Sequence, residues 1–321
     1  MHRRTMITGL AMLPVAWASA PARAAGTTAI VVGYSAGGST DIIARVLAPA
    51  LSQKLGRTAI VEDRPGAAAQ IASMYVERSA ADGSVLQLAT ATSHAVAPTL
   101  YRHLAYNPVK DFTPIGRVAQ APLVLIVNNS VPVKSVAELI KYDKAQSHPI
   151  FACGGIGDGS DMAALLMDSM AHIKATAVAY QGDARALPAV VGGHVPYMFF
   201  LTPTATEALA TGRVRALAVT TKARLAKFPN IPTMAESGFP GYEAVTWWGL
   251  FGPARMRPDL VERINKALNE VLAEPAVRHR LDPQGYQLTP STPAEFKAFV
   301  AAENKKWATV IRKEGVAGTA G

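Results

Sequence analysis

Residues 28–51, TAIVVGYSAGGSTDIIARVLAPAL, constrain the fold more than any other stretch because they combine a strand, a glycine loop and a helix. The β-branched apolar run at residues 29–32 is typical of a strand that is buried on both faces. The sequence GGSTD at residues 37–41 breaks regular structure with two glycines and then supplies side chains suited to a helix start. Apolar residues follow at helical spacing. This unit predicts either an anion site at the helix N-terminus or an ordinary strand-to-helix turn.

Strands and helices alternate along most of the remaining chain. We expect a helix over residues 67–78, turns at residues 111–114, and helices that begin at Ser135, Pro258 and Thr292. The expected strands are residues 58–62, 85–90, 123–127, 150–152, 176–180, 197–201, 215–220 and 245–251. This alternation predicts an α/β protein with mostly parallel sheets flanked by helices.

A second strand–glycine loop–helix unit begins at residue 150, and CGGIGDGSD occupies positions 153–161. The chain therefore holds two potential anion sites. The apolar strands at residues 123–127 and 245–251 are predicted to cross between two lobes, and ligands of such sheets bind beyond the carboxyl ends of the strands. We therefore expect two lobes that face each other across a cleft.

The first 24 residues have the features of an export signal. His2, Arg3 and Arg4 form a basic start, residues 6–17 an apolar core, and residues 22–24 a small-residue cleavage site. We expect cleavage after residue 24, since cleavage after residue 20 would leave a proline at the next position. The arginine pair leaves both the Sec and the twin-arginine route open. No later stretch has about 18 uninterrupted apolar residues, so the mature chain is expected outside the membrane.

Composition excludes several classes of site. Cys153 is the only cysteine, which excludes an internal disulfide, a cysteine zinc cluster and a lipid-modified cysteine at the cleavage site. Loss of the three arginines of the export signal lowers the formal charge from +9 to +6, and the remaining basic residues are scattered. This pattern argues against nucleic acid as a partner. The dispersed histidines and the lack of a complete nucleotide motif predict neither a metal nor a cofactor.

The sequence GYSAG at residues 33–37 matches the nucleophile elbow of α/β-hydrolases, with Ser35 as the candidate nucleophile. The elbow of such enzymes follows several strands, whereas only the export signal precedes this one. His279 falls in an expected helix, and His94 and His194 fit no usual triad order. A secreted serine hydrolase is therefore the weaker alternative, and we expect no catalytic residues.

Trp247 and Trp248 are adjacent in an expected strand, so their side chains should point to opposite faces. Two interpretations remain open. One tryptophan lines the cleft, or one lies in the core and the other at a hinge.

Many ordered blocks give the chain a resemblance to the Bug family, the periplasmic substrate-binding receptors of tripartite tricarboxylate transporters in Gram-negative bacteria. The resemblance runs from about residue 29 to the C-terminus. The blocks include VVGYSAGGSTDIIARVLAPALSQKLG, VEDRPGAAAQI, ADGSVLQLATATSHAVAPTLY, NPVKDFTPIGRVAQAPLVLIVN, VAYQGDARALPAVVGGHVPYMF, GRVRALAVTTKAR, IPTMAESGFPGYE and WWGLFGPA.

The resemblance implies a two-lobed periplasmic-binding-protein fold of type II (a Venus flytrap) that closes on a small carboxylate. It places one ligand carboxylate against the two glycine loops, and it implies the following ligand-binding residues: Tyr34, Ser35, Ala36, Gly37, Gly38, Ser39, Thr40, Ala68, Ala69, Thr92, Ser93, Gly157, Asp158, Gly159, Ser160, Asp161, Tyr180, Gln181 and Gly182. Asp41 is instead expected to stabilise its own helix.

Three departures from the family pattern bear on the ligand. Gly33 and Tyr34 replace a common proline or phenylalanine, and Asp161 stands where a histidine is usual. An acid at 161 would repel a second ligand anion unless it is protonated, or would favour an amine or a hydroxyl. Pro196 and Phe200 replace frequent aspartates, and we expect Phe200 to add apolar surface to the site. These differences favour a monocarboxylate or an aromatic carboxylate over an acidic amino acid.

The expected protein is a periplasmic receptor, released by cleavage of residues 1–24, that binds a small carboxylate and acts as a monomer. Its expected partner is an integral-membrane permease of the tripartite tricarboxylate type, or alternatively a sensor kinase. We expect residues 25–126 and 244–321 to form one lobe and residues 127–243 the other.

Overall fold

The structure is a computed structural model that describes residues 26–320, so the predicted export signal lies outside the described residues. Its strands are β1 (Thr27–Val32), β2 (Thr58–Asp63), β3 (Val85–Thr90), β4 (Phe112–Asn128), β5 (Ile150–Cys153), β6 (Thr176–Ala179), β7 (Tyr197–Leu201), β8 (Val214–Val219), β9 (Val245–Pro253) and β10 (Gln287–Leu288). Its α-helices are α1 (Ser39–Leu55), α2 (Gln70–Glu77), α3 (Ala97–Leu100), α4 (Val136–Ala145), α5 (Gly159–Ala171), α6 (Asp183–Val191), α7 (Thr202–Ala210), α8 (Pro258–Ala273), α9 (Pro275–Leu281) and α10 (Pro293–Lys313).

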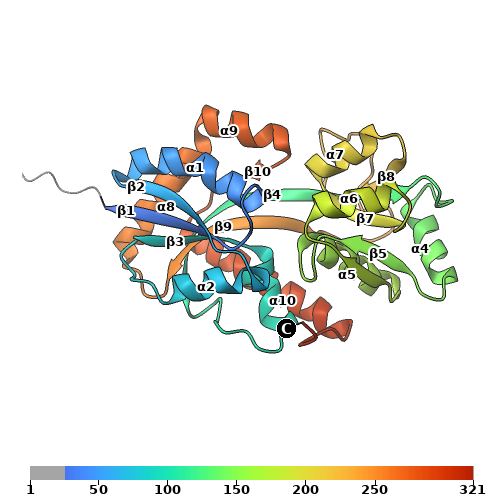
Figure 1. The fold of residues 1–321 in the computed structure, drawn as a ribbon, viewed down its shortest axis with the longest axis horizontal. Helices are drawn as coiled ribbons and strands as arrows, with labels where there is room; N and C mark the ends of the chain where they lie inside the picture. Colours follow the sequence, from blue (N-terminus) through green and yellow to red (C-terminus); the bar gives the residue numbers. More distant parts are fainter. Residues whose placement is uncertain (1–25, 321) are drawn as a thin grey trace, which may run out of the picture.

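Two long strands, β4 and β9, join the two lobes (Figure 1). The strand order is β2-β1-β3-β9-β4-β7-β5-β6, and β8 and β10 also pair with β4. The strands that alternate with helices, β1 to β3 and β5 to β7, pair in parallel as predicted. The long strands pair antiparallel with their neighbours. The prediction of a two-lobed α/β fold is confirmed.

The strand β4 is much longer than predicted. It begins at Phe112, so the expected turn at residues 111–114 is wrong from Phe112 onward. Pro114 lies within the strand, next to a register shift between Pro114 and Gly116 against β9. A proline is tolerated there because an irregular position does not require its missing N–H.

Three apolar clusters stabilise the fold. One lies under α1, α8 and α9, a second under α6 and α7, and the third runs under both lobes on the side of α2, α5 and α10. Trp247 belongs to the third cluster and Trp248 to the first, so the two rings point to opposite faces as predicted. Both rings are buried in the core, and neither lines the pocket between the lobes.

The predicted helix over residues 67–78 begins later, at Gln70. Ala67, Ala68 and Ala69 instead have left-handed backbone conformations with φ values of 46°, 50° and 71°. Gly33 explains part of this geometry, because a Cβ at that position would lie 2.3 Å from the Cβ of Ala69. A left-handed backbone is unfavourable for alanine, and such strain concentrates at functional sites.

None of the helices between residues 26 and 320 combines the length and the apolar character needed to cross a membrane.

Candidate functional site

The two glycine loops share one backbone arrangement. Gly37 has a φ of 81° and donates its N–H to Asp41 Oδ2 at 2.7 Å. Gly157 has a φ of 78° and donates its N–H to Asp161 Oδ2 at 2.7 Å. In each case the helix begins two residues after the glycine. Each aspartate therefore ties its loop to the first turn of the helix that follows.

The first loop leaves the N-terminus of α1 open. The residue before this helix is Gly38, which offers no side chain to cap the first-turn N–H groups. Residues 35–38 are exposed. Asp41 is buried but paired, since Arg45 Nε lies 2.6 Å from its Oδ1. Although burial acts to raise the pKa of Asp41, the bonds from Arg45 and Gly37 hold that pKa below its ordinary value. An open helix N-terminus attracts an anion.

Two side chains next to the first loop are bonded to the body of the lobe. The Tyr34 hydroxyl is 2.8 Å from Thr90 Oγ1, at the end of β3. The Thr40 hydroxyl accepts a hydrogen bond from Trp248 Nε1 at 2.9 Å. Ser39, which lies between Tyr34 and Thr40 in the sequence, is half-buried. These contacts fix the loop to β3 and β9.

The second loop is capped by its own acid. Asp158 Oδ1 accepts the N–H of Asp161 at 2.9 Å and the hydroxyl of Ser160 at 2.5 Å. The carboxylate of Asp158 thus occupies the place that a bound anion would take at the start of α5. The sequence predicts two equivalent anion sites, but the two loops differ in this respect.

Three carboxyls gather behind the second loop: Asp158, Asp161 and Asp183. Burial raises the pKa of Asp158 to about 6 and those of Asp161 and Asp183 to about 7. Among residues 26–320, none of the three takes part in an ion pair. The second loop is therefore acidic, whereas Arg45 neutralises the acid of the first.

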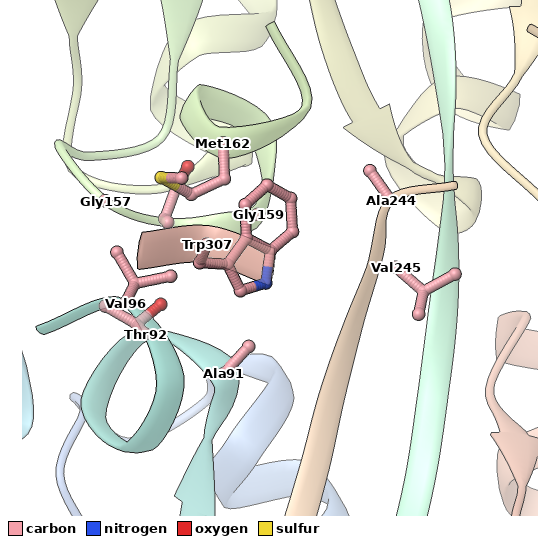
Figure 2. Close-up of a pocket in the computed structure, with 10 residues that line it drawn as sticks. Ala91, Thr92, Val96, Gly157, Gly159, Met162, Ala244, Val245 and Trp307 are labelled. Atoms are coloured by element: carbon pink, nitrogen blue, oxygen red, sulfur yellow. The ribbon is translucent and has the colours of Figure 1, made fainter. Parts of the chain in front are cut away.

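A narrow pocket lies between the lobes (Figure 2). Thr92 lines it from the first lobe, Met162 from the second, and Trp307 of α10 lies between them. The second loop packs directly on this region: a Cβ at Gly157 would lie 2.5 Å from Leu100 Cδ2 of α3. The complete lining is Ala91, Thr92, Val96, Gly157, Asp158, Gly159, Met162, Ala244, Val245 and Trp307.

The structure brings only part of the predicted site to this pocket: Thr92, Gly157, Asp158 and Gly159. Residues 180–182 adjoin the second loop, since Tyr180 and Gly182 donate their N–H groups to the carbonyls of Cys153 and Gly154 at 2.9 and 2.7 Å. Residues 34–40, on the first loop and at the start of α1, lie outside the lining. Ala69 lies close to Gly33, where a Cβ would come within 2.3 Å of the Cβ of Ala69, and Ala68 precedes it in the chain.

Ser93 faces the protein interior. Its side chain is fully buried, and its hydroxyl lies 3.2 Å from the Thr90 carbonyl and 3.0 Å from His94 Nδ1. His94 is itself enclosed by Phe112 and Phe251. Burial lowers the pKa of His94 to about 3, so this histidine is neutral. It is bonded to Ser93 and gives no support to a triad based on Ser35.

One expectation about specificity changes. Phe200 is fully buried in the second-lobe core among residues such as Val124 and Met198, so the expectation that it adds apolar surface to the site is wrong. Asp161 is 8% exposed, and its carboxylate accepts a hydrogen bond from the N–H of Gly157.

The pocket residues that sequence reasoning missed are Ala91, Val96, Met162, Ala244, Val245 and Trp307.

No group of three or more histidine, cysteine, aspartate or glutamate side chains in the described residues is arranged to hold a metal ion.

Comparisons with known proteins bear on the family and the fold. Residues 43–316 match the family described as the tripartite tricarboxylate transporter family receptor. The Protein BugT of Bordetella pertussis is 32% identical over 288 residues, which cover 89% of this chain and 88% of BugT.

Solved structures are also similar. The R. palustris protein Rpa4515 with adipate has a TM-score of 0.81 and 31% identity, over 91% of this chain and 98% of that one. The MatC protein of Rhodopseudomonas palustris with bound malate has a TM-score of 0.79 and 30% identity, over 89% and 98%.

Proposed function

The chain belongs to the tripartite tricarboxylate transporter receptor family, and from this premise we propose that it captures a small carboxylate between its two lobes. One observation carries the proposal. The N-terminus of α1 is open, the loop that precedes it is exposed, and the nearby acid Asp41 is neutralised by Arg45. A ligand carboxylate can accept the first-turn N–H groups there and interact with the positive end of the helix dipole.

Relatives of known structure support the class of ligand. One similar structure contains adipate and another contains malate, and both of these are carboxylates. For this chain we propose a ligand with a single carboxylate at the first loop, because the acids of the second loop would repel a second one. An aromatic body is compatible with this proposal, although the buried Phe200 no longer supports it.

The proposed mechanism is closure without catalysis. A ligand that contacts both loops stabilises the closed form, and its binding shifts the equilibrium between open and closed lobes. We propose that the moving units are residues 25–126 with 244–321, and residues 127–243. The receptor would act in the periplasm as a monomer after removal of residues 1–24. It would deliver its ligand to a tripartite tricarboxylate-type permease or signal its presence to a sensor kinase.

A thermal-shift screen tests the proposed function. The probes are benzoate, phenylacetate, hexanoate, malate, adipate, citrate and glutamate, with choline chloride as a control that lacks a carboxylate. A ligand at about 100 times its Kd adds about 2.7 kcal/mol to the free energy of unfolding, so the Tm rises. Failure of every carboxylate to raise the Tm would overturn the proposal. Tighter binding of citrate or glutamate than of any monocarboxylate would overturn the part that concerns the ligand.

The hydrolase alternative receives its own test. A receptor leaves a short-chain ester intact, and Ser35→Ala then changes nothing in an ester assay. Turnover that disappears in Ser35→Ala would instead establish a hydrolase.

A further inference from the structure

The indole ring of Trp307 lies inside the pocket between the two lobes (Figure 2). It is the largest side chain of the lining and is 2% exposed. Within residues 26–320, no lysine, arginine or histidine lines this pocket. A second carboxylate of a ligand would therefore find no cation there, whereas an apolar group needs none. The other apolar residues of the lining are Ala91, Val96, Met162, Ala244 and Val245.

Glu303, which is 8% exposed, holds this ring in place. The Trp307 indole N–H donates to Glu303 Oε2 at 3.0 Å. The other carboxylate oxygen, Oε1, lies 3.2 Å from Lys306 Nζ, and that nitrogen lies over the Trp307 ring, 4.3 Å from its centroid. The ring is thus fixed both at its N–H and on one face. An aromatic side chain that is already fixed loses little entropy when it contacts a ligand.

The same carboxylate oxygen ties the ring to β9, one of the two strands that join the lobes. Glu303 Oε2 also accepts the indole N–H of Trp247, on β9, at 3.2 Å. The Trp247 ring packs edge-on against Phe296 and Phe299 of α10, with centroid distances of 6.0 and 5.5 Å. Loss of the carboxylate would leave two buried N–H groups without an acceptor. One buried acid therefore sets where the Trp307 ring lies relative to β9.

The first glycine loop is anchored next to this pocket. Tyr34, at the start of the loop, has its hydroxyl 2.8 Å from Thr90 Oγ1. Ala91 and Thr92, the next two residues after Thr90 in the chain, line the pocket. A ligand whose carboxylate binds at the first loop can therefore extend its remaining atoms toward Trp307.

We propose that Trp307 selects the ligand by contact with the apolar body of a monocarboxylate, and that Glu303 is a positioning residue that acts through Trp307. The inference rests on the proposed function, in which the ligand carboxylate binds at the N-terminus of α1. The pocket is narrow in this arrangement of the lobes, so the ligand body enters while the lobes are apart, and closure packs it against the ring. The favoured ligands are alkyl and arylalkyl monocarboxylates, because their bodies bury apolar surface without an unpaired polar group.

A ligand series tests the proposal by calorimetric titration of the unaltered protein with butanoate, hexanoate, phenylacetate, succinate and malate. Two added CH2 groups should make hexanoate bind about tenfold more tightly than butanoate. Hexanoate and phenylacetate should each bind at least about tenfold more tightly than succinate or malate. A gain of less than about threefold from butanoate to hexanoate, or equal binding of a dicarboxylate, overturns this inference and leaves the proposed function standing. If none of the five binds, this inference fails, and the proposed function fails with it if every carboxylate of the thermal-shift screen is also without effect.

Substitutions locate the contact, and the gain in affinity from butanoate to hexanoate is the readout. Trp307→Ala should abolish this gain, whereas a purely structural role of Trp307 would weaken the binding of both acids alike and leave the gain unchanged. Glu303→Ala frees the ring and should reduce the gain. Glu303→Gln keeps an oxygen for both indole N–H groups and should restore most of it.

Phe239→Leu is the matched control, because Phe239 is a buried ring of the same apolar cluster that lies outside the pocket lining. This variant should leave the gain unchanged. A gain that persists in Trp307→Ala contradicts the assignment, and the ligand series on the unaltered protein remains decisive if a variant does not fold.

Discussion

Asp41 and Asp161 occupy the same place in their two loops, yet only Asp41 has a cation beside it. Each accepts the N–H of the glycine four residues earlier at 2.7 Å. Four residues later in the helix, the first loop has Arg45, 2.6 Å from Asp41, and the second has Leu165. The shared backbone makes both loops suitable helix starts, and the arginine leaves the first loop less acidic than the second.

The left-handed glycines of the loops should be sensitive to a Cβ. Gly37→Ala should lower the free energy of unfolding by about 1 kcal/mol, because φ is positive there and no atom lies close to the new Cβ. Gly157→Ala should cost more, since its Cβ would also collide with Leu100. Urea denaturation measures both changes. Gly212→Ala, at another positive-φ glycine with open space, is the control for strain alone and should leave ligand binding intact. Equal losses of unfolding free energy in Gly37→Ala and Gly157→Ala would contradict the predicted collision with Leu100.

The left-handed alanines should respond in the opposite direction. Ala68→Gly should raise the free energy of unfolding by up to about 1 kcal/mol, since glycine adopts a φ of 50° without steric cost. Ala72→Gly in the helix α2 should instead lower it by about 1 kcal/mol. Chemical denaturation of the two variants gives both values. A loss of stability in Ala68→Gly would mean that this segment is not strained.

Stability should fall as the pH rises from about 4 to about 7 because of two buried acids in the second lobe. Burial raises the pKa of Asp143 to about 6 and that of Asp168 to about 7, above the value near 4 of an unfolded chain. The folded state therefore binds more protons than the unfolded state, and this contribution is complete below about pH 4 and lost between about pH 4 and 7. Asp168→Asn should flatten the dependence of the unfolding free energy on pH. Asp259→Asn, an exposed acid paired with Arg257, should not. An identical slope in Asp168→Asn and the parent would contradict the assignment.

Periodicity and glycine loops were enough to predict both strand–loop–helix units, because a buried β-branched run and a helix start leave local signals. The left-handed conformation of residues 67–69 has no local signal in the sequence, since it depends on the close approach of Gly33. Trp307 reaches the pocket from α10, far along the chain from either loop, and only the tertiary fold brings it there. The burial of Phe200 likewise follows from how β7 packs under α6 and α7.

The central claim is that the uncapped N-terminus of α1 holds the ligand carboxylate. An aspartate at position 38 would give α1 the cap that Asp158 gives α5, and this substitution tests the claim most directly. Gly38 corresponds to Asp158, has an ordinary extended backbone with φ −77° and ψ 168°, and has space for a side chain apart from a 3.3 Å approach to the Ser35 carbonyl. Gly38→Asp should cap α1 and raise the free energy of unfolding by about 1 kcal/mol. Its carboxylate should also occupy the proposed anion site. Gly38→Asn provides a cap without the charge.

The measurement is a calorimetric titration of the unaltered protein, Gly38→Asn and Gly38→Asp with the tightest carboxylate from the thermal-shift screen. We predict that Gly38→Asp is more stable than the unaltered protein but binds the carboxylate at least about a hundredfold more weakly. The affinity of Gly38→Asn should lie between those of the unaltered protein and Gly38→Asp. Unchanged carboxylate affinity in a folded Gly38→Asp protein would contradict the claim that the first loop holds the carboxylate.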